Sequence, residues 1–388
     1  MSRAGRGKAT RRVLRVCSIA LAAVELQLLS PVTRPPAAAQ GPSTQGAKAV
    51  RVRLIPDRPF VERDERGLYL NCDFRVENHA GERIRLTRIE VATLDAANRI
   101  WSRRFLSKQG SLSPALETLP RREIDSGDVV DIFNPFHTLD PAVPTAALRF
   151  EFHFQGKQRY DAAVTVHPVP YQPRTELIVP LRGPFLVYDG HDFYSHHRRI
   201  DLSRPEIRRL GLTFNPVRYA YDFSPVDATQ SLHRGDPAKP ENWIAYDAPV
   251  YAPAAGRVVS VANDVPDNRI ENGRLVYPEL PNDAAKRVLG NYVLIDHGAG
   301  EYSLLSHLKV NTVAVRPNDR VSQDQLVGRI GFSGDTGLHV HLHYHLADGP
   351  DPLAASSLPV YFRGHRLLPS GRRVVKDGLL HTGQLVER

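Results

Sequence analysis

Four histidines alternate with other residues over 338–346 and form the most concentrated chemical pattern in the sequence. Successive side chains of a β-strand point to opposite faces, so a strand here would place all four imidazoles on one face and aliphatic residues with Tyr344 on the other. Neighbouring imidazoles would be about 6.6 Å apart along the strand, and the outer two about 20 Å apart. With zinc–nitrogen bonds of about 2.0 Å, at most two adjacent imidazoles can serve one metal ion. The four residues are His339, His341, His343 and His345.

The pattern alone leaves two interpretations of this strand open. The first is an exposed polar face that binds metal ions weakly and without catalysis, as His-rich tracts do. The second is a metal centre to which one or two of the imidazoles belong. The distribution of histidine along the chain favours the second, because ten of the 16 histidines lie between His191 and His345.

Further motifs precede the histidine strand. They are a Tyr-Ala-Tyr-Asp-Phe segment, an apolar segment that contains Pro and Gly, and two apolar runs of which the second ends in Ser-His-Leu. Together with the closing His-x-His, and in this order, they resemble the lysostaphin-type zinc metalloendopeptidases, also called LytM-domain or β-lytic peptidases. The resemblance covers about residues 185–355 and implies a LytM-type antiparallel β-sheet peptidase domain. The segments are 219–223, 248–259, 291–298, 301–308 and 341–343.

The resemblance implies a role for several residues of this sequence. The His-x-His pair makes His343 a zinc ligand and His341 a catalytic partner beside it. His307 matches the histidine after the family's central strand and would orient or deprotonate the attacking water, or stabilise the oxyanion. Asp222 matches the aspartate ligand. A carboxylate and two imidazoles would leave the fourth tetrahedral position of Zn2+ open for water, as catalysis requires.

The sequence departs from the family at the remaining ligand. The usual residue is a histidine four positions before the aspartate, but this position is Arg218, which stays protonated and cannot bind zinc. Some relatives bring this histidine from further upstream, and the candidates here are the adjacent His196 and His197, with His191 before them. Adjacent strand residues face opposite ways, so at most one of the pair should point into the site, and we favour His197. With neither in reach, the site would have two protein ligands and would be inactive.

The N-terminal half has a different pattern. From residue 49 to about 170, apolar and polar residues alternate with period two between turn sequences, as in 68–76 and 148–154. This predicts an all-β chain in which an immunoglobulin-like β-sandwich precedes the peptidase domain. No catalytic constellation falls in the sandwich, so its expected role is structural or in recognition. Cys72 lies on the apolar side of the alternation and is expected to be a buried core residue without a disulfide partner.

The first 39 residues combine a basic start, a short apolar stretch at 16–29 and an Ala-Ala-Ala sequence before Gln40. This composition predicts a secretory signal peptide cleaved near Ala39. The alternative is an uncleaved membrane anchor, but a stretch of about 14 residues that includes Glu25 is short of the roughly 20 that a spanning helix needs. The predicted divisions are a signal peptide at 1–39, a linker at 40–48, the β-sandwich domain at 49–170, a linker at 171–184, the peptidase domain at 185–362 and a C-terminal tail at 363–388.

Charge and motifs exclude other classes of function. Seven basic residues and one acidic residue in the first 39 carry +6 of the formal net charge of +9, so the rest lacks the charge of a nucleic-acid-binding protein. The sequence also has no Gly-rich phosphate loop, no nucleophile elbow and no catalytic-cysteine arrangement. Nucleotide chemistry and serine or cysteine nucleophiles therefore have no support.

The sequence predicts an exported zinc metalloendopeptidase, in the periplasm or outside the cell, that hydrolyses peptide bonds in peptidoglycan cross-links or stems, as the resemblance implies. Its expected partners are peptidoglycan peptides and, through the N-terminal domain, another cell-wall protein. Nucleic acid and stable membrane insertion after signal cleavage are not expected. Arg218 keeps open a second hypothesis, a degenerate LytM-like regulator that binds and activates other cell-wall hydrolases. A third is a secreted zinc-binding or adhesion protein whose histidines only capture metal.

Overall fold

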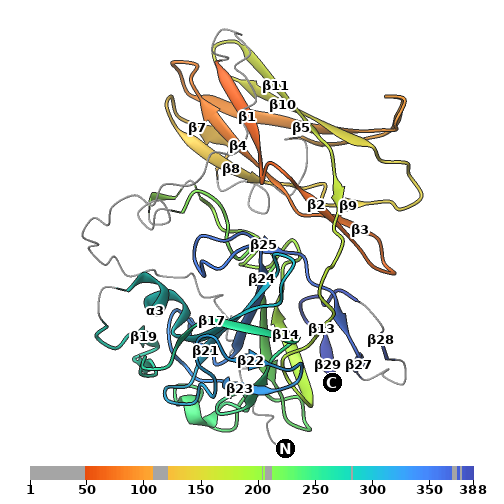
Figure 1. Cartoon of the computed structure of the whole chain (residues 1–388). Helices are drawn as coiled ribbons and strands as arrows, with labels where there is room; N and C mark the ends of the chain where they lie inside the picture. Colours follow the sequence, from red (N-terminus) through yellow and green to blue (C-terminus); the bar gives the residue numbers. More distant parts are fainter. Residues whose placement is uncertain are drawn as a thin grey trace, which may run out of the picture. The chain divides into compact units, whose positions relative to one another are not determined.

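The computed structural model describes residues 49–107, 121–202, 204–205, 212–280, 283–368, 374–375 and 378–388 (Figure 1). The predicted signal peptide and the first linker lie outside these residues. Strands dominate the described chain, and the helical segments described in full are α3 (Ala284–Leu289) and the 3-10 helix η1 (Pro240–Asn242). The expected all-β class is therefore confirmed. No helix in the described ranges is long and apolar enough to cross a membrane.

Two antiparallel sheets form the N-terminal domain. One consists of β1 (Val50–Ile55), β4 (Asp73–Asn78) and β8 (Val129–Phe133), and the other of β11 (Arg159–Val166), β10 (Ala147–Gln155), β5 (Ile84–Leu94) and β6 (Ile100–Ser107), with β7 (Glu123–Ile124) beside β5. Alternate residues of β10 are buried, and Phe150 and Phe152 meet Phe74 of β4 at ring-centroid distances of 4.5 and 5.0 Å. The two sheets thus share one core, and an immunoglobulin-like topology stays a prediction.

A third sheet, made of four short strands, is connected through β3 to the sheet that contains β4. It consists of β12 (Val169–Pro170), β2 (Phe60–Arg63), β3 (Leu68–Leu70) and β9 (Thr138–Leu139). Residues 71 and 72 join β3 directly to β4 and are buried. Cys72 is fully buried, as expected, and burial raises the pKa of its thiol to about 12. This thiol is therefore protonated at neutral pH.

The region predicted as the peptidase domain is built on one large sheet whose paired strands run antiparallel. Its order is β22 (Arg320–Val321), β17 (Gly256–Ala262), β20 (Asn291–Asp296), β21 (Tyr302–Leu308), β24 (Leu342–Ala347), β15 (Tyr221–Pro225), β14 (Pro184–Asp189), β29 (Leu385–Glu387), β27 (His365–Leu368) and β28 (Val374–Val375), with β25 (Ser357–Leu358) beside β24. Leu342, Tyr344 and Leu346 of β24 pack in the core with Phe223 of β15, so His343 and His345 lie on the other face. The strand expected over 338–346 begins only at Leu342, and His339 and His341 lie in the irregular segment before it.

Three two-stranded pairs complete the described domain. They are β13 (Leu177–Ile178) with β26 (Phe362–Arg363), β16 (Pro249–Tyr251) with β23 (Leu326–Arg329), and β18 (Arg269–Glu271) with β19 (Arg274–Val276). The linker expected at 171–184 contains β13, and Leu177, Val179 and Leu181 are buried in the main core. The tail expected at 363–388 contains β27, β28 and β29, and β29 pairs with β14. The main sheet therefore continues beyond residue 362.

Candidate metal centre

Neighbouring strands of the main sheet carry a row of polar residues at matching positions. Asp189 at the end of β14 lies opposite Asp222 of β15, and Asp222 lies opposite His343 of β24. On the other side of β24, Ser306 of β21 lies opposite His343, and His307 follows it. Cross-strand partners in a sheet have side chains on the same face, about 5 Å apart. The register of the sheet therefore brings together residues that are far apart in the sequence.

Asp222 is the centre of the cluster. Its Oδ1 lies 3.2 Å from Nδ1 of His343, 3.4 Å from Nε2 of His197 and 3.3 Å from Nε2 of His341. Burial raises the pKa of this carboxyl, but the imidazoles of His197 and His341 outweigh burial and lower the pKa well below its usual range. Asp222 is therefore a charged carboxylate in a buried site.

Hydrogen bonds to backbone carbonyls fix the tautomers of two of these imidazoles. Nδ1 of His197 lies 3.1 Å from the carbonyl oxygen of Gly190, and Nδ1 of His341 lies 3.0 Å from the carbonyl oxygen of His339. A carbonyl oxygen only accepts, so Nδ1 donates in both rings and the lone pair of each neutral ring is on Nε2. Both Nε2 atoms face the carboxylate of Asp222. In the neutral form of both rings, these lone pairs and the carboxylate converge in a buried site, and a metal ion would supply the positive charge that such a convergence needs.

The donor set fits zinc. In a tetrahedral site with bonds of about 2.0–2.1 Å, neighbouring ligand atoms are roughly 3.3 Å apart. The distances from Asp222 Oδ1 to His343 Nδ1, His341 Nε2 and His197 Nε2, 3.2, 3.3 and 3.4 Å, all match this spacing, and the choice of His343 over His341 as the ligand follows the family resemblance. Imidazole nitrogen and carboxylate oxygen are ordinary zinc ligands, and three of them leave a fourth position open.

The two adjacent histidines have different environments. His197 is buried, whereas half of the side-chain surface of His196 is exposed. Nδ1 of His196 bonds to the carboxylate of Asp189, and its Nε2 lies 4.0 Å from Asp222 Oδ2. Burial lowers the pKa of His196, but the bond to Asp189 and the charge of Asp222 raise it above its usual value. The possible ligand atoms of Asp189, His196, His197 and Asp222 all lie within 4.8 Å of one another.

Asp189 was not among the residues predicted from the sequence. It ends β14, directly before Gly190 and seven positions before His196. A carboxylate at a strand end, followed closely by a histidine pair, is the signal that could have identified it. Asp189 holds the exposed histidine of the pair, whereas the buried His197 approaches Asp222.

The two outer histidines of the 338–346 pattern serve as partners of other side chains. Nδ1 of His345 lies 3.0 Å from Nε2 of His343, which is the ring nitrogen that points away from Asp222. Nε2 of His339 lies 2.7 Å from the hydroxyl of Ser224. All four histidines of the pattern are buried, so the interpretation as an exposed metal-capturing face is wrong.

His307 lies in a β-bulge. Its backbone is left-handed, with φ of 62°. The register of β20 and β21 shifts here, because Asn291 pairs with Leu308 and Val293 with Leu305, so one more residue lies between the pairs on β21 than on β20. A bulge re-aims a side chain relative to the regular strand. A left-handed residue other than glycine costs roughly 1–2 kcal/mol, so the surroundings must hold it.

The ring of His307 is aimed at the cluster. Its centroid lies 4.9 Å from that of His341 and 5.7 Å from that of His343. Nδ1 lies 2.9 Å from the carbonyl oxygen of Ser333 and therefore donates, which leaves Nε2 as the acceptor. Burial, together with the neighbouring His341, lowers the pKa of His307 to about 3. His307 is thus a neutral hydrogen-bond acceptor at physiological pH.

Close backbone packing supports the bulge. The carbonyl oxygen of Leu308 accepts hydrogen bonds from Asn291 Nδ2 at 2.9 Å and from Ser333 Oγ at 2.7 Å. Gly290 lies directly before β20 and has φ of 64°. A Cβ atom at this position would lie 2.3 Å from Ser333 Oγ. No other residue type fits this position without moving Ser333. Sequence analysis did not identify Asn291, Ser333 or Gly290 as supports of the site.

Replacement of Gly290 by Ala is expected to lower the free energy of unfolding by roughly 2–4 kcal/mol, because backbone strain and overlap with Ser333 add. Gly298→Ala is the matched control, since Gly298 is also left-handed but a Cβ there meets nothing within 4 Å. Strain alone should cost the control about 1 kcal/mol. Urea unfolding of both variants tests this, and equal losses would show that the overlap is absent.

Arg218 does not enter the cluster. Its Nη1 lies 2.6 Å from Asp73 Oδ2 and 3.1 Å from Asn71 Oδ1. The side chain of Arg218 is buried, and its guanidinium group makes these contacts. The position of the usual family ligand is therefore occupied by a residue with a different partner, while His197 approaches Asp222 from the loop that follows β14.

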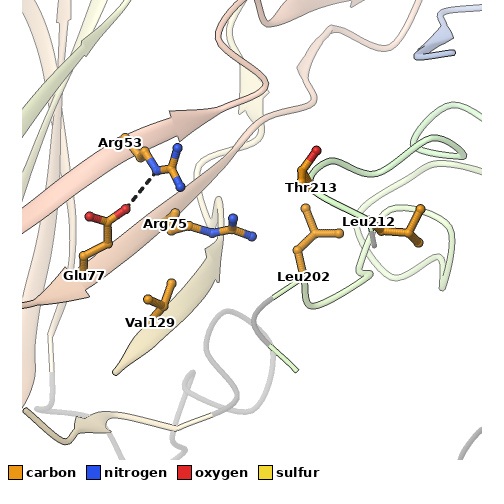
Figure 2. Close-up of a pocket in the computed structure, with 7 residues that line it drawn as sticks. All are labelled: Arg53, Arg75, Glu77, Val129, Leu202, Leu212 and Thr213. Carbon is orange, nitrogen blue, oxygen red and sulfur yellow. Dashed lines mark ion pairs between the residues drawn. The ribbon is translucent and has the colours of Figure 1, made fainter. Parts of the chain in front are cut away.

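A hollow of about 310 Å³ lies elsewhere in the described chain (Figure 2). Its lining includes Arg75 and the ion pair of Arg53 with Glu77, 3.1 Å apart, which come from the N-terminal domain, together with Leu202 and Thr213. None of its lining residues belongs to the cluster around Asp222. The candidate metal centre is thus separate from this hollow.

A comparison with protein-family models agrees with the resemblance. Residues 243–354 match the model of peptidase family M23, and this range contains His307, His341 and His343. Similar solved structures include a putative M23 peptidase from Pseudomonas aeruginosa (13% identity, 70% of this chain and 89% of that chain covered, TM-score 0.25), a zinc-containing peptidase from Vibrio cholerae (13%, 74% and 81%, 0.23) and the catalytic domain of lysostaphin from Staphylococcus simulans (16%, 36% and 74%, 0.21). No curated protein matches the chain. The similarity to peptidase family M23 rests on the sequence match over residues 243–354.

Proposed function

We propose that the protein is an exported, zinc-dependent metalloendopeptidase that hydrolyses peptide bonds in the cross-links or stems of peptidoglycan. In this proposal His197, Asp222 and His343 hold the zinc ion, and His307 and His341 are the catalytic residues. The match of residues 243–354 to peptidase family M23 supports the reaction class. Export is inferred from the signal peptide predicted at 1–39.

The convergence of imidazole lone pairs on the carboxylate of Asp222 is the observation that carries the proposal. The Nδ1 atoms of His197 and His341 are used by backbone carbonyls, and their Nε2 atoms lie 3.4 and 3.3 Å from Asp222 Oδ1. His343 Nδ1 lies 3.2 Å from the same oxygen. Three imidazole nitrogens within 3.4 Å of one buried carboxylate oxygen are a donor set that zinc binds, and this supports a bound cation.

Zinc in this position would polarise the scissile carbonyl and make a water molecule a stronger nucleophile. The different environments of His341 and His307 fit two different roles, proton transfer and orientation of the water. The pKa of about 3 makes Nε2 of His307 a poor proton acceptor but a good hydrogen-bond acceptor, so we assign it the orientation of the attacking water. His341 Nε2 then accepts the proton of that water and passes it to the nitrogen of the leaving amine.

Arg218 keeps the alternative of a degenerate regulator open. The buried His197, 3.4 Å from Asp222 Oδ1, supports the enzyme, because it is positioned to supply the imidazole that position 218 lacks. The two functions still differ in a measurable property, because a regulator of this kind folds without zinc and does not cleave. Metal content and cleavage should therefore be measured on the same preparation.

The experiment is incubation of the purified full chain with isolated peptidoglycan sacculi, with and without a chelator. We expect about one tightly bound zinc ion per chain and newly freed amino groups that the chelator suppresses. Re-addition of zinc should restore the release. A folded protein that holds no zinc and frees no amino groups would overturn the enzyme and favour the regulator. Bound zinc without release would overturn peptidoglycan as the substrate.

A further inference from the structure

The N-terminal domain contacts both segments that bring ligands to the candidate metal centre. Asp73, the first residue of β4, accepts hydrogen bonds from Arg198 Nη1 at 2.6 Å to each carboxylate oxygen and from Arg218 Nη1 at 2.6 Å. Arg198 directly follows His197, and Arg218 lies four positions before Asp222. One carboxylate outside the peptidase sheet thus joins the two chain segments that carry His197 and Asp222.

The contact is deeply buried. Asp73, Arg198 and Arg218 are 3, 2 and 5 % exposed. Nη2 of Arg198 also donates to the carbonyl oxygen of Cys72 at 2.8 Å, so the guanidinium is held at two points of the β3–β4 connection. Burial raises the pKa of Asp73, but the two guanidinium groups outweigh burial and lower it below its usual value. Asp73 is therefore a charged partner of both arginines.

The ligands differ in how they depend on this contact. Asp222 and His343 lie on directly paired strands, so the sheet itself fixes their spacing. His197 lies in the loop after β14, where no described residue belongs to a strand. Within the peptidase domain its backbone is held by Ser195 Oγ at 3.1 Å and by Asn215 Nδ2 at 2.6 Å. The bond from Arg198 to Asp73 fixes the next residue of this loop.

A second contact joins the same loop to the N-terminal domain. Nε2 of His191 lies 2.9 Å from a carboxylate oxygen of Glu62, and both residues are buried. The loop that carries His197 is thus tied to the N-terminal domain before and after the ligand. This arrangement gives the N-terminal domain a role in building the metal centre.

We propose that Asp73 is a positioning residue for the metal centre, acting on His197 through Arg198. The inference rests on the proposed zinc-dependent function and adds a contribution of the N-terminal domain to it. In the family's usual arrangement, a histidine at position 218 would lie on the same chain segment as Asp222. Here the ligand is on a loop, and the N-terminal domain holds that loop in place. Loss of Asp73 leaves two buried guanidinium groups without their carboxylate and releases the loop that carries His197.

The test compares Asp73→Asn with Asp131→Asn in the full chain. Asp131 is a matched control, because it is 2 % exposed, lies on the neighbouring strand β8 and pairs with Arg75 of β4 at 2.8 Å. Zinc affinity is measured by competition with a chromophoric chelator, and coordination by the visible spectrum of the cobalt-loaded protein. We expect zinc binding by Asp73→Asn to weaken roughly 10- to 100-fold with a changed cobalt spectrum, as for other residues that orient ligands. Asp131→Asn should keep the wild-type affinity and spectrum.

Each outcome decides between the proposals. Wild-type affinity and spectrum in Asp73→Asn would overturn the positioning role and leave the zinc enzyme intact. Equal weakening in both variants would also overturn it, since general loss of the N-terminal domain would then be the cause. Absence of zinc binding by the wild-type chain would overturn the proposed function itself. If near-UV circular dichroism shows that Asp73→Asn does not fold, Arg198→Lys replaces it and should weaken zinc binding in the same direction, because lysine cannot contact Asp73 and the Cys72 carbonyl together.

Discussion

Replacement of His343 by Ala is expected to remove tight zinc binding and with it the chelator-sensitive hydrolysis. His343 contributes Nδ1 at 3.2 Å from Asp222 Oδ1, and its loss leaves one imidazole and one carboxylate at the proposed zinc. The affinity should fall by more than the roughly 10- to 100-fold that loss of a residue behind a ligand costs. Zinc content after dialysis, and amino groups freed from sacculi, measure the two effects.

His339→Gln is the matched control for this variant. His339 is also buried on the same face, but its Nε2 contacts Ser224 Oγ and not Asp222. Its backbone carbonyl, which holds His341, is kept in the variant. The control should retain about one zinc ion per chain. Full zinc occupancy in His343→Ala would contradict the assignment of His343 as a ligand.

Replacement of His307 by Asn is expected to lower kcat by roughly 10²- to 10⁴-fold while zinc stays bound, because an imidazole that acts on the water and not on the metal is lost. Asparagine is chosen because it tolerates the left-handed backbone that His307 adopts, with φ of 62°. Steady-state kinetics on a soluble peptide from peptidoglycan and zinc analysis measure the two properties.

The free energy of unfolding serves as the control for His307→Asn. It should remain within about 1 kcal/mol of the wild-type value, since Asn291 and Ser333 still hold the bulge through the Leu308 carbonyl. His343→Ala and His307→Asn thus separate metal binding from catalysis. Loss of zinc from His307→Asn, or an unchanged kcat, would contradict the assigned role.

Local periodicity was sufficient to predict the parts of the site that lie on regular strands. The alternation correctly placed His343 and His345 on the face opposite Leu342 and Tyr344, but β24 begins at Leu342, so the predicted strand over 338–346 was too long and His339 and His341 precede it. The resemblance singled out Asp222 and His307, which the sheet register brings to the same cluster as His343. A period of two is an intrinsic property of a strand, so one sequence reveals it without any knowledge of the strand's neighbours.

The remaining contacts depend on strand pairing and domain packing that no local pattern encodes. Whether His196 or His197 approaches Asp222 is decided by a turn after β14, and the alternation rule used for strands does not apply there. Asp189 enters the cluster because β14 pairs with β15, and Asp73 because the β3–β4 connection meets Arg198 and Arg218. The short strands in 171–184 and 363–388 carry too few residues to show a period.

The direct pairing of β15 with β24 has a consequence for the kinetics of metal exchange. Asp222 and His343 are a cross-strand pair of β15 and β24 and can separate only if these two strands come apart, so together they form a stable two-residue binding site for the ion. His197 lies outside this strand pair, on a loop held by the N-terminal domain, so its position can change only when the contacts of that loop loosen. Zinc binding should then occur in two steps, with fast binding to Asp222 and His343 followed by slower closure of the loop that carries His197. The second step should set the residence time of the ion.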